Sequence, residues 1–243
     1  MNFEKIIKQL STCIAGFIMF ALAAGVYLNI KGFGFDANGN IALINSAHAA
    51  EPELGGPRTL APNVVIPGGR SLGSQSAPVT IYEYSSLGCT HCAYFHLDTL
   101  PLLEKSYIKQ GKVRLVFSSF PLDKSSLKAA MLAACMPNDK YFDFINLLFE
   151  HQRSWGLAFN TEKALAKYAA QTGMSQDKAY ACMQDKQMAQ ELADRRQRAI
   201  QTIKIQGTPT FVIATPDSRE VIFGAPTFEE LKTIIDKKLK QGW

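Results

Sequence analysis

Beyond a Gly- and Pro-rich N-terminal region, short β-branched segments alternate with longer amphipathic ones. Residues 79–85 are rich in β-branched and aromatic side chains and are followed by Gly88, which predicts a buried strand and a turn. Apolar residues then recur at helical spacing to about Gln110, so we predict a helix there, bent at Pro101. Residues 113–117 predict a second strand.

A long helical segment separates these elements from the C-terminal ones. The helical pattern is interrupted at Pro137, at residues 154–160 and at Gly173. The predicted elements of this part are helical stretches within 125–203, strands at 210–213 and 221–224, and a helix at 227–240. The order is therefore strand, helix, strand, helical insert, hairpin, helix, which is an α/β arrangement.

The N-terminus predicts membrane insertion and export. Lys5 and Lys8 precede an uncharged run at residues 11–30, and about 20 such residues are enough to cross a bilayer. The positive charges favour a cytoplasmic location for residues 1–10 and export of the chain after the run. The run either stays as a transmembrane anchor or acts as a signal that is cleaved near Ala49. We expect a periplasmic protein, tethered to the inner membrane or released from it.

Residues 31–69 are punctuated by Gly and Pro, a composition that predicts a flexible linker. The folded domain is therefore expected at residues 70–243, with its helical insert at about 124–203. Such a linker would let an exported domain reach partners near the membrane.

Composition narrows the function classes. The 243 residues are 47% hydrophobic and 19% charged, which is typical of a folded domain. The formal net charge is only +5 and no run of five like charges occurs, so we expect no nucleic-acid partner. Four of the five cysteines, Cys89, Cys92, Cys135 and Cys182, lie in the predicted domain and allow two disulfides.

The candidate chemistry lies in Cys89-Thr90-His91-Cys92, between the first predicted strand and the first predicted helix. Unpaired backbone N–H groups and the helix dipole favour a thiolate at the first sulfur. The two-residue spacing lets Cys92 resolve a mixed disulfide formed on Cys89. We expect the His91 imidazole, either protonated or donating a hydrogen bond, to stabilise the Cys89 thiolate, and Thr90 to modulate the pair with it.

Two other readings compete with a redox pair. Cys89, His91, Cys92 and His96 are potential zinc ligands, but structural zinc sites usually combine two ligand pairs and no second pair lies nearby in sequence. A purely structural disulfide in this motif would close a loop too small to remove much unfolded-state entropy. We therefore favour redox chemistry that uses no metal and no cofactor.

Several motifs together resemble the DsbA-like thioredoxin family. They are Leu72-Gly73, Ala77-Pro78-Val79-Thr80-Ile81, Cys89-Thr90-His91-Cys92, Phe120-Pro121-Leu122, the Ala-rich segment 128–135 and Gly207-Thr208-Pro209-Thr210-Phe211. The resemblance implies a thioredoxin fold with an inserted all-helical domain, which agrees with the predicted element order. It also implies an exported thiol:disulfide oxidoreductase that introduces disulfides into unfolded client proteins and is reoxidised by a membrane quinone-linked partner.

The resemblance also assigns roles to three further residues. Pro209 corresponds to the family's cis-proline, and Thr208 before it is expected to modulate Cys89 and to pair with extended client peptide. Glu83 resembles the family's buried acid beneath the cysteine pair, a proton relay for Cys92. Without the resemblance, Thr208 is a plain β-branched residue, Pro209 an ordinary strand-entry proline and Glu83 an edge-strand residue that faces solvent.

Cys135 and Cys182 lie on separate helical stretches. In an oxidising compartment two such cysteines usually pair. Closing a loop of this length contributes about 4 kcal/mol in the chain-entropy model, so we expect a structural disulfide between them.

We expect oxidation rather than isomerisation as the main activity. Dedicated isomerases of this fold usually need a dimerisation element ahead of the catalytic domain, and residues 31–69 hold no periodic run long enough to build one. Thr208 argues the other way, since it resembles the isomerase branch. A disulfide isomerase or reductase and a non-catalytic periplasmic chaperone are the alternatives.

Overall fold

The structure, a computed structural model, describes residues 33–35, 41–43 and 58–241. These residues belong to two compact units, which divide after Glu53. In the first unit, β1 (Phe33–Phe35) and β2 (Ile41–Leu43) form an antiparallel pair. Aromatic and aliphatic residues dominate both strands, a composition that favours strand formation.

The predicted membrane features lie outside the described residues. These features are the cytoplasmic segment 1–10, the uncharged run 11–30 and the cleavage site near Ala49. Within the described part of the chain, no helix has both the length and the apolarity of a membrane span.

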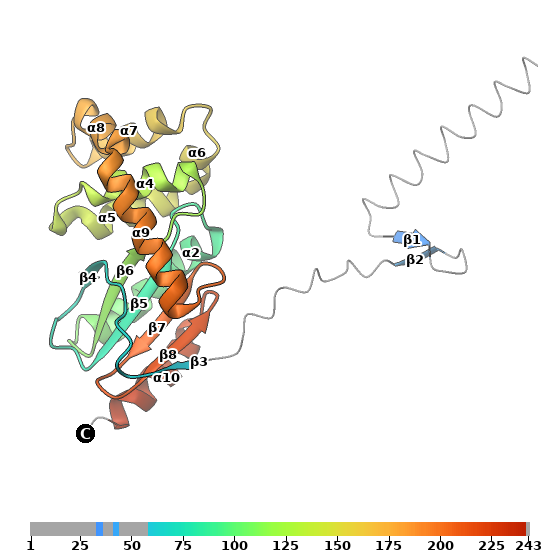
Figure 1. The fold of residues 1–243 in the computed structure, drawn as a ribbon, viewed down its shortest axis with the longest axis vertical. Helices are drawn as coiled ribbons and strands as arrows, with labels where there is room; N and C mark the ends of the chain where they lie inside the picture. Colours follow the sequence, from blue (N-terminus) through green and yellow to red (C-terminus); the bar gives the residue numbers. More distant parts are fainter. Residues whose placement is uncertain (1–32, 36–40, 44–57, 242–243) are drawn as a thin grey trace, which may run out of the picture. The chain divides into compact units, whose positions relative to one another are not determined.

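The second unit is built on a six-stranded mixed sheet (Figure 1). Its strands are β3 (Arg58–Leu60), β4 (Arg70–Leu72), β5 (Val79–Ser85), β6 (Val113–Ser119), β7 (Thr210–Ala214) and β8 (Arg219–Phe223). They lie side by side in the order β3-β8-β7-β5-β6-β4. The central strand β5 runs parallel to β6 and antiparallel to β7, and this position explains why none of its seven residues is exposed.

Helices cover both faces of this sheet. On one face, Val79 and Ile81 of β5 pack in a cluster with the helical run that follows β5 and with α10 (Phe228–Gln241). On the other face, Tyr84 and Val212 pack against α9 (Lys186–Ile203), which crosses in front of the strands in Figure 1. The alternation of side chains along β5 therefore supplies two separate cores.

The helical run after β5 holds α2 (Thr90–Tyr94) and α3 (Leu100–Leu103), each followed by a π-helical turn. Pro101 lies in the first turn of α3, directly after the first π-helical turn. Its ring lacks an N–H and would clash with a carbonyl four residues earlier. The wider π-helical turn before Pro101 avoids that clash. A π-helical turn therefore stands where the sequence predicted a bend.

The helical insert has a hydrophobic core of its own. Its helices are α4 (Lys124–Ala134), α5 (Asn138–Glu150), α6 (Gln152–Gly156), α7 (Thr161–Gln171), α8 (Gln176–Gln184) and α9. Four of them begin at side-chain caps, in which Asp123, Asn160, Ser175 and Asp185 each accept a hydrogen bond from the backbone N–H three residues later. These caps fix the helix boundaries that the sequence pattern only approximated.

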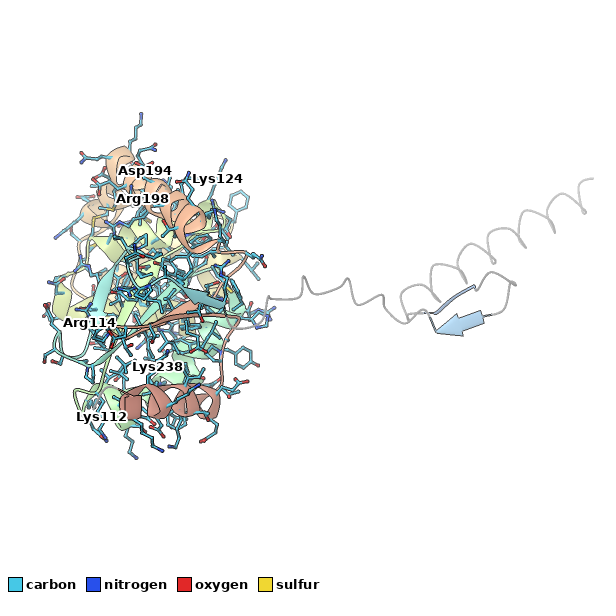
Figure 2. The ribbon with its side chains drawn as sticks, turned by 60° about the horizontal axis from the view of Figure 1, so that its bottom comes forward. Lys112, Arg114, Lys124, Asp194, Arg198 and Lys238 are labelled. Atoms are coloured by element: carbon cyan, nitrogen blue, oxygen red, sulfur yellow. A yellow bond between two sulfur atoms is a disulfide. The ribbon has the colours of Figure 1, made fainter. Side chains whose placement is uncertain are left out.

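A charged contact joins α10 to the sheet. Lys238, labelled in Figure 2, lies 3.2 Å from a carboxylate oxygen of Glu220 on β8 and donates a hydrogen bond to the Ser218 hydroxyl at 3.1 Å. The Lys238 side chain is largely buried, so its aliphatic stem packs against the sheet while the ammonium group meets its partners.

The folded unit begins earlier than the predicted boundary at Arg70. β3 pairs with β8, and the Arg58 guanidinium donates a hydrogen bond to the Ile203 carbonyl and lies 5.9 Å from the centre of the Phe223 ring. The prediction of a flexible linker over residues 31–69 is therefore wrong for its last part. An edge strand of three residues is too short to produce a detectable periodicity.

Candidate active site

Cys89 occupies the N-cap position of α2, directly after the turn that follows β5. Its backbone is extended, with φ −91° and ψ 123°, and no side chain caps the helix. The backbone N–H groups of the first helical turn are therefore free to face the Cys89 sulfur. This is the helix-terminus position that favours a thiolate.

The helical insert holds the turn that carries Cys89. The Gln152 side chain at the start of α6 donates hydrogen bonds to the carbonyls of Leu87 at 2.7 Å and Cys89 at 3.0 Å. Gly88 lies against the start of α4, where an added Cβ would be 3.2 Å from the Ser126 Cβ. The sequence analysis missed Gln152, because only the fold brings α6 to this turn.

The pKa of the Cys89 thiol is lowered from 9.0 to about 5. The largest cause is a hydrogen bond with the Cys92 side chain, and the Thr208 side chain and the backbone N–H groups of Cys92 and His91 add to it. Burial of the half-buried sulfur acts in the opposite direction. Cys89 is therefore a thiolate at neutral pH.

Cys92 has the opposite electrostatic environment. Its side chain is fully buried, and burial raises the pKa of its thiol far above the ordinary value. The hydrogen bond with Cys89 and the charges of Cys89 and Glu83 raise it further, while the nearby Ser85 side chain lowers it. Both cysteines are free thiols in this structure. The pair thus combines a reactive, accessible sulfur with a protonated, hidden one.

The Thr208–Pro209 peptide bond faces Cys89 and is cis. The Cys89 thiol donates a hydrogen bond to the Thr208 carbonyl at 3.2 Å. The Thr208 hydroxyl is buried and has no hydrogen-bond partner among the described side chains, and the Thr208 side chain lowers the pKa of Cys89. Once Cys89 is ionised, this hydroxyl is a donor available to the sulfur.

Glu83 lies fully buried on β5, with 0% of its surface exposed, and its charge acts on Cys92. Both of its carboxylate oxygens lie 3.1 Å from Nε2 of His96. His96 Nδ1 in turn lies 3.1 Å from Oδ1 of Asn146 on α5. The sequence singled out Glu83 but missed Asn146 and considered His96 only as a zinc ligand, since partners on other elements leave no local signal.

Thr90 and His91 both have exposed side chains. His91 lowers the pKa of Cys89 through its backbone N–H, whereas the sequence analysis assigned this effect to its imidazole. A first-turn backbone donor has its position fixed by the helix, whatever side chain it carries. In the ranges that the structure describes, no group of three or more His, Cys, Asp or Glu side chains gathers as metal ligands would.

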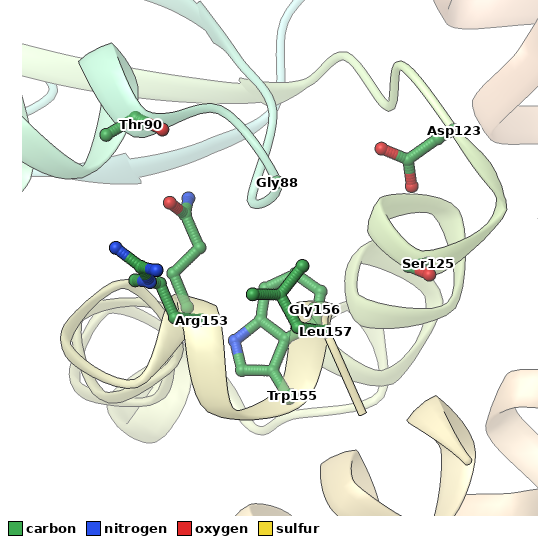
Figure 3. Close-up of a pocket in the computed structure, with 9 residues that line it drawn as sticks. Gly88, Thr90, Asp123, Ser125, Arg153, Trp155, Gly156 and Leu157 are labelled. Carbon is green, nitrogen blue, oxygen red and sulfur yellow. The ribbon is translucent and has the colours of Figure 1, made fainter. Parts of the chain in front are cut away.

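A cavity of about 350 Å³ opens beside Gly88 and Thr90, the two residues that flank Cys89 in the sequence (Figure 3). It is lined by Gly88, Thr90, Asp123, Ser125, Gln152, Arg153, Trp155, Gly156 and Leu157. Leu157, which lines the cavity, is 77% exposed, and Leu122, the residue before the lining Asp123, is 52% exposed. The lining therefore offers both polar and apolar side chains beside the turn that carries Cys89.

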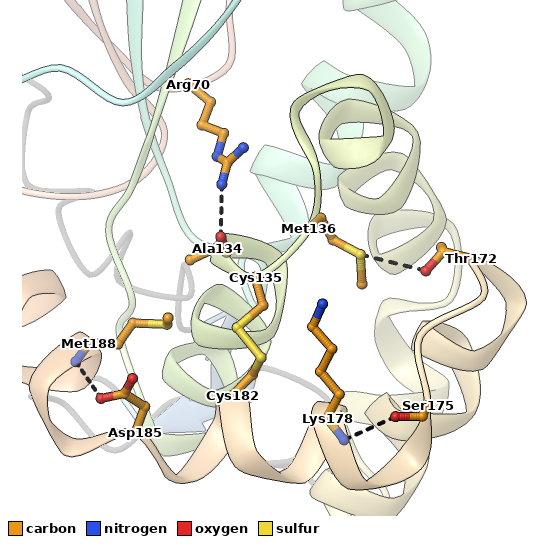
Figure 4. Close-up of a disulfide and its surroundings, with 10 residues drawn as sticks. All are labelled: Arg70, Ala134, Cys135, Met136, Thr172, Ser175, Lys178, Cys182, Asp185 and Met188. Atoms are coloured by element: carbon orange, nitrogen blue, oxygen red, sulfur yellow. Dashed lines mark hydrogen bonds between the residues drawn. A yellow bond between two sulfur atoms is a disulfide. The ribbon is translucent and has the colours of Figure 1, made fainter.

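Cys135 and Cys182 form a disulfide within the helical insert (Figure 4). Cys135 follows the end of α4, and Cys182 lies in α8, 47 positions later. The loop that this bond closes contains α5, α6 and α7, so it ties the outer helices of the insert together.

Comparison with known proteins identifies the fold. Over residues 66–237 the chain matches a protein family described as Thioredoxin. The crystal structure of α-DsbA1 from Wolbachia pipientis is similar over 74% of this chain and 94% of that chain, with a TM-score of 0.67 and 29% sequence identity. The structure of BdbD from Bacillus subtilis is similar over 75% of this chain and 98% of that chain, with a TM-score of 0.65 and 27% identity.

Sequence relatives agree with these structures. Disulfide bond formation protein D of Bacillus subtilis is 27% identical over 179 residues, which are 72% of this chain and 79% of the relative. A Rickettsia felis protein that bears the name of a protein-disulfide oxidoreductase is 27% identical over 171 residues, 70% of this chain. The chain spans only 60% of that relative's length. The matches confirm the predicted thioredoxin fold with an inserted all-helical domain, and this chain belongs to the thioredoxin family.

Proposed function

We propose that this protein is an exported thiol:disulfide oxidoreductase that introduces disulfide bonds into client proteins. The observation that carries the proposal is the contrast within the cysteine pair. Cys89 has a pKa of about 5 at a helix N-terminus, while burial raises the pKa of Cys92 far above its ordinary value. A disulfide between two such sulfurs is easily reduced, because the reduced form is stabilised by the Cys89 thiolate.

The exchange proceeds in two balanced steps. A client thiolate attacks the Cys89 sulfur of the oxidised pair, so that a bond to the client forms, the bond to Cys92 breaks and the electron pair goes to the Cys92 sulfur. A second client thiolate then attacks the client sulfur of this mixed disulfide, and Cys89 leaves as a thiolate. The client gains a disulfide and the cysteine pair is reduced. The low pKa of Cys89 makes it a good leaving group in the second step.

The proposed substrates are unfolded exported proteins, and a membrane quinone-linked partner is the proposed source of reoxidation. The names of the Bacillus and Rickettsia relatives support oxidation of protein thiols. Extended client peptide would lie beside Thr208, whose carbonyl already contacts Cys89. The reoxidising partner rests on the family resemblance of the sequence.

Export is proposed from the uncharged run at residues 11–30, which follows Lys5 and Lys8. The run would tether the folded unit on the outer side of the inner membrane, or be removed by cleavage near Ala49. Protease added outside the inner membrane should digest the folded unit in either case. A mature N-terminus at Ala50 would favour the released form, and full protection from the protease would refute export.

Refolding of a multi-disulfide substrate tests the activity. The oxidised protein should rapidly oxidise a fully reduced substrate and slowly rescue a scrambled one. Faster rescue of the scrambled substrate would favour isomerisation, which Thr208 supports as the second candidate. A cysteine pair that neither oxidises nor reduces reversibly would point to a non-catalytic chaperone.

A further inference from the structure

The Ser85 hydroxyl is a buried donor that the exchange steps described above do not use. Ser85 is the last residue of β5, and only 1% of its surface is exposed. Across residues 58–241, its hydroxyl oxygen is buried and meets no hydrogen-bond partner. A buried hydroxyl without a partner costs free energy, so in a native protein such a group calls for a functional explanation.

The backbone fixes the position of Ser85 at the end of the central strand. Ser85 pairs with Ser119 in the parallel register of β5 and β6, and its carbonyl accepts a hydrogen bond from the Phe120 N–H at 2.8 Å. Side chains alternate along a strand, so Ser85 lies on the same face of β5 as Glu83. The contact of Glu83 with His96 shows that this face packs against the helical run that begins with α2. The Ser85 hydroxyl therefore lies in the layer that holds the cysteine pair.

Cys92 lies in this layer and lacks the donors that Cys89 has. It is fully buried in the hydrophobic cluster of the helical insert. Its own backbone N–H stabilises the Cys89 sulfur, so the start of α2 serves Cys89. The Ser85 side chain acts on Cys92 and favours its ionised form, whereas burial, Cys89 and Glu83 all oppose ionisation. Ser85 is thus placed to assist a charge on Cys92 that its other surroundings disfavour.

We propose that the Ser85 hydroxyl donates a hydrogen bond to the Cys92 sulfur as the active-site disulfide opens, and so stabilises Cys92 as the leaving group. A neutral sulfur is a weak acceptor, whereas an ionised acceptor makes a much stronger hydrogen bond. The bond therefore forms mainly as charge develops on Cys92, and such an interaction accelerates the step. Ser85 is a catalytic residue in this proposal, because its hydroxyl meets a reacting atom. The inference rests on the proposed oxidoreductase function.

Ser85 forms no covalent bond in this step and gives up no proton. The attacking thiolate forms a bond to Cys89, the bond between Cys89 and Cys92 breaks, and the electron pair goes to the Cys92 sulfur. In the reverse direction Cys92 attacks the mixed disulfide as a thiolate, and the same hydrogen bond assists it. Burial keeps Cys92 protonated in the stable reduced state. The hydrogen bond thus speeds opening and closing equally and leaves the equilibrium between disulfide and dithiol unchanged.

Each of the two sulfurs accordingly has a buried hydroxyl of its own. The Thr208 hydroxyl is also buried without a partner among the described residues, and the Thr208 side chain lowers the pKa of Cys89. The Cys89 thiolate persists in the reduced protein, so the effect of Thr208 extends to the reduction potential. The Cys92 thiolate exists only while exchange proceeds, so the effect of Ser85 is confined to the rate.

The test compares the rate of opening with the reduction potential in Ser85→Ala. Dithiothreitol is the probe, because its first thiolate attacks Cys89 and its second thiol then resolves the mixed disulfide and releases the reduced protein. We expect the second-order rate of reduction at neutral pH to be about three- to tenfold lower than in the unaltered protein. The reduction potential, measured against glutathione, should stay the same.

Ser118→Ala is the matched control. Ser118 is a buried serine on the neighbouring strand β6, and its hydroxyl donates a hydrogen bond to the Pro67 carbonyl. It pairs in register with Tyr84, so it lies on the opposite face of the sheet from Ser85. This variant should keep the rate and the potential of the unaltered protein. Equal rates for Ser85→Ala and Ser118→Ala would overturn the inference and leave the proposed function intact. Failure of dithiothreitol to open the pair in the unaltered protein would instead refute the proposed function.

A second pair of variants keeps the inference testable if Ser85→Ala does not fold. Ser85→Thr and Ser85→Val add nearly the same volume, so they share any disturbance of packing, and only Ser85→Thr retains a hydroxyl. Reduction by dithiothreitol should be at least about threefold faster in Ser85→Thr than in Ser85→Val, with equal reduction potentials. Equal rates in this pair would overturn the inference. A difference in potential as large as the difference in rate would also overturn it, because the hydroxyl would then stabilise the reduced protein and not the opening step.

Discussion

Lowering the pH is expected to destabilise the reduced protein more than the oxidised one. In the folded reduced protein the pKa of Cys89 is about 5, against 9.0 for an ordinary thiol. A group whose pKa is lowered by folding stabilises the folded state fully above its unfolded pKa, and it loses this contribution as the pH falls through its folded pKa. The oxidised protein has no Cys89 thiol to titrate, so it serves as the reference.

The magnitude follows from the same two values. At neutral pH the folded Cys89 thiol is ionised and the unfolded one is protonated. Neutral pH lies about two units above the folded pKa of Cys89, and this difference stabilises the folded state by about 2.7 kcal/mol. Cys89 is only half-buried, and solvent screening reduces this to about 2 kcal/mol. For a two-electron couple, the same free energy raises the reduction potential by about 40 mV.

The assay is urea unfolding of the reduced and the oxidised protein at a series of pH values, with the Cys135–Cys182 disulfide intact in both. The free energy of unfolding of the reduced protein should fall by about 2 kcal/mol relative to the oxidised protein between neutral pH and pH values below the Cys89 pKa. Reduced Cys89→Ser should lack this fall. A difference that stays constant over this range, or that grows in acid, would refute the assignment of Cys89 as a stabilised thiolate.

Three further predictions follow from contacts around the site. Thr208→Val keeps the shape but removes the hydroxyl, and it should raise the pKa of Cys89 by up to about one unit, measured as the pH dependence of alkylation. Gln152→Ala removes two hydrogen bonds to the Cys89 turn, and urea unfolding should show a loss of about 1–2 kcal/mol. Replacing Cys135 and Cys182 by Ala should lower the free energy of unfolding by about 2–4 kcal/mol while glutathione still opens the active-site pair. An unchanged pH dependence of alkylation would contradict the prediction for Thr208→Val, and an unchanged urea midpoint would contradict the one for Gln152→Ala. Failure of glutathione to open the active-site pair would contradict the prediction for the variant without Cys135 and Cys182.

The fold was predictable from the sequence because its main signals are local. The β-branched run of β5, the turn at Gly88 and the Cys-x-x-Cys motif are contiguous, so they identify a strand, a turn and a helix N-terminus without any knowledge of tertiary contacts. The helical insert is recognisable for the same reason, since its helices are long enough to show their period. The short strand β3 lacks this advantage, and only its pairing with β8 reveals it.

The candidate site was predictable only in part. The sequence singled out both cysteines and Glu83, because a lone carboxylate in an apolar strand is conspicuous. Gln152 and Asn146 are ordinary polar residues on helices, and their roles depend on which surface those helices present to β5 and its turn. Tertiary contacts of this kind have no counterpart in the local pattern of the chain.

The two cysteines owe their different pKa values to different parts of the molecule. Cys89 is stabilised as a thiolate by donors at the start of α2, by Thr208 and by Cys92, all close to the sheet end. The largest cause of the raised pKa of Cys92 is burial, and Cys92 belongs to the hydrophobic cluster that forms the core of the helical insert. A loosened insert core would therefore lower the pKa of Cys92 while leaving most donors to Cys89 in place. The insert thus acts on the pKa of the pair mainly by burying Cys92, while its Gln152 holds the turn that carries Cys89.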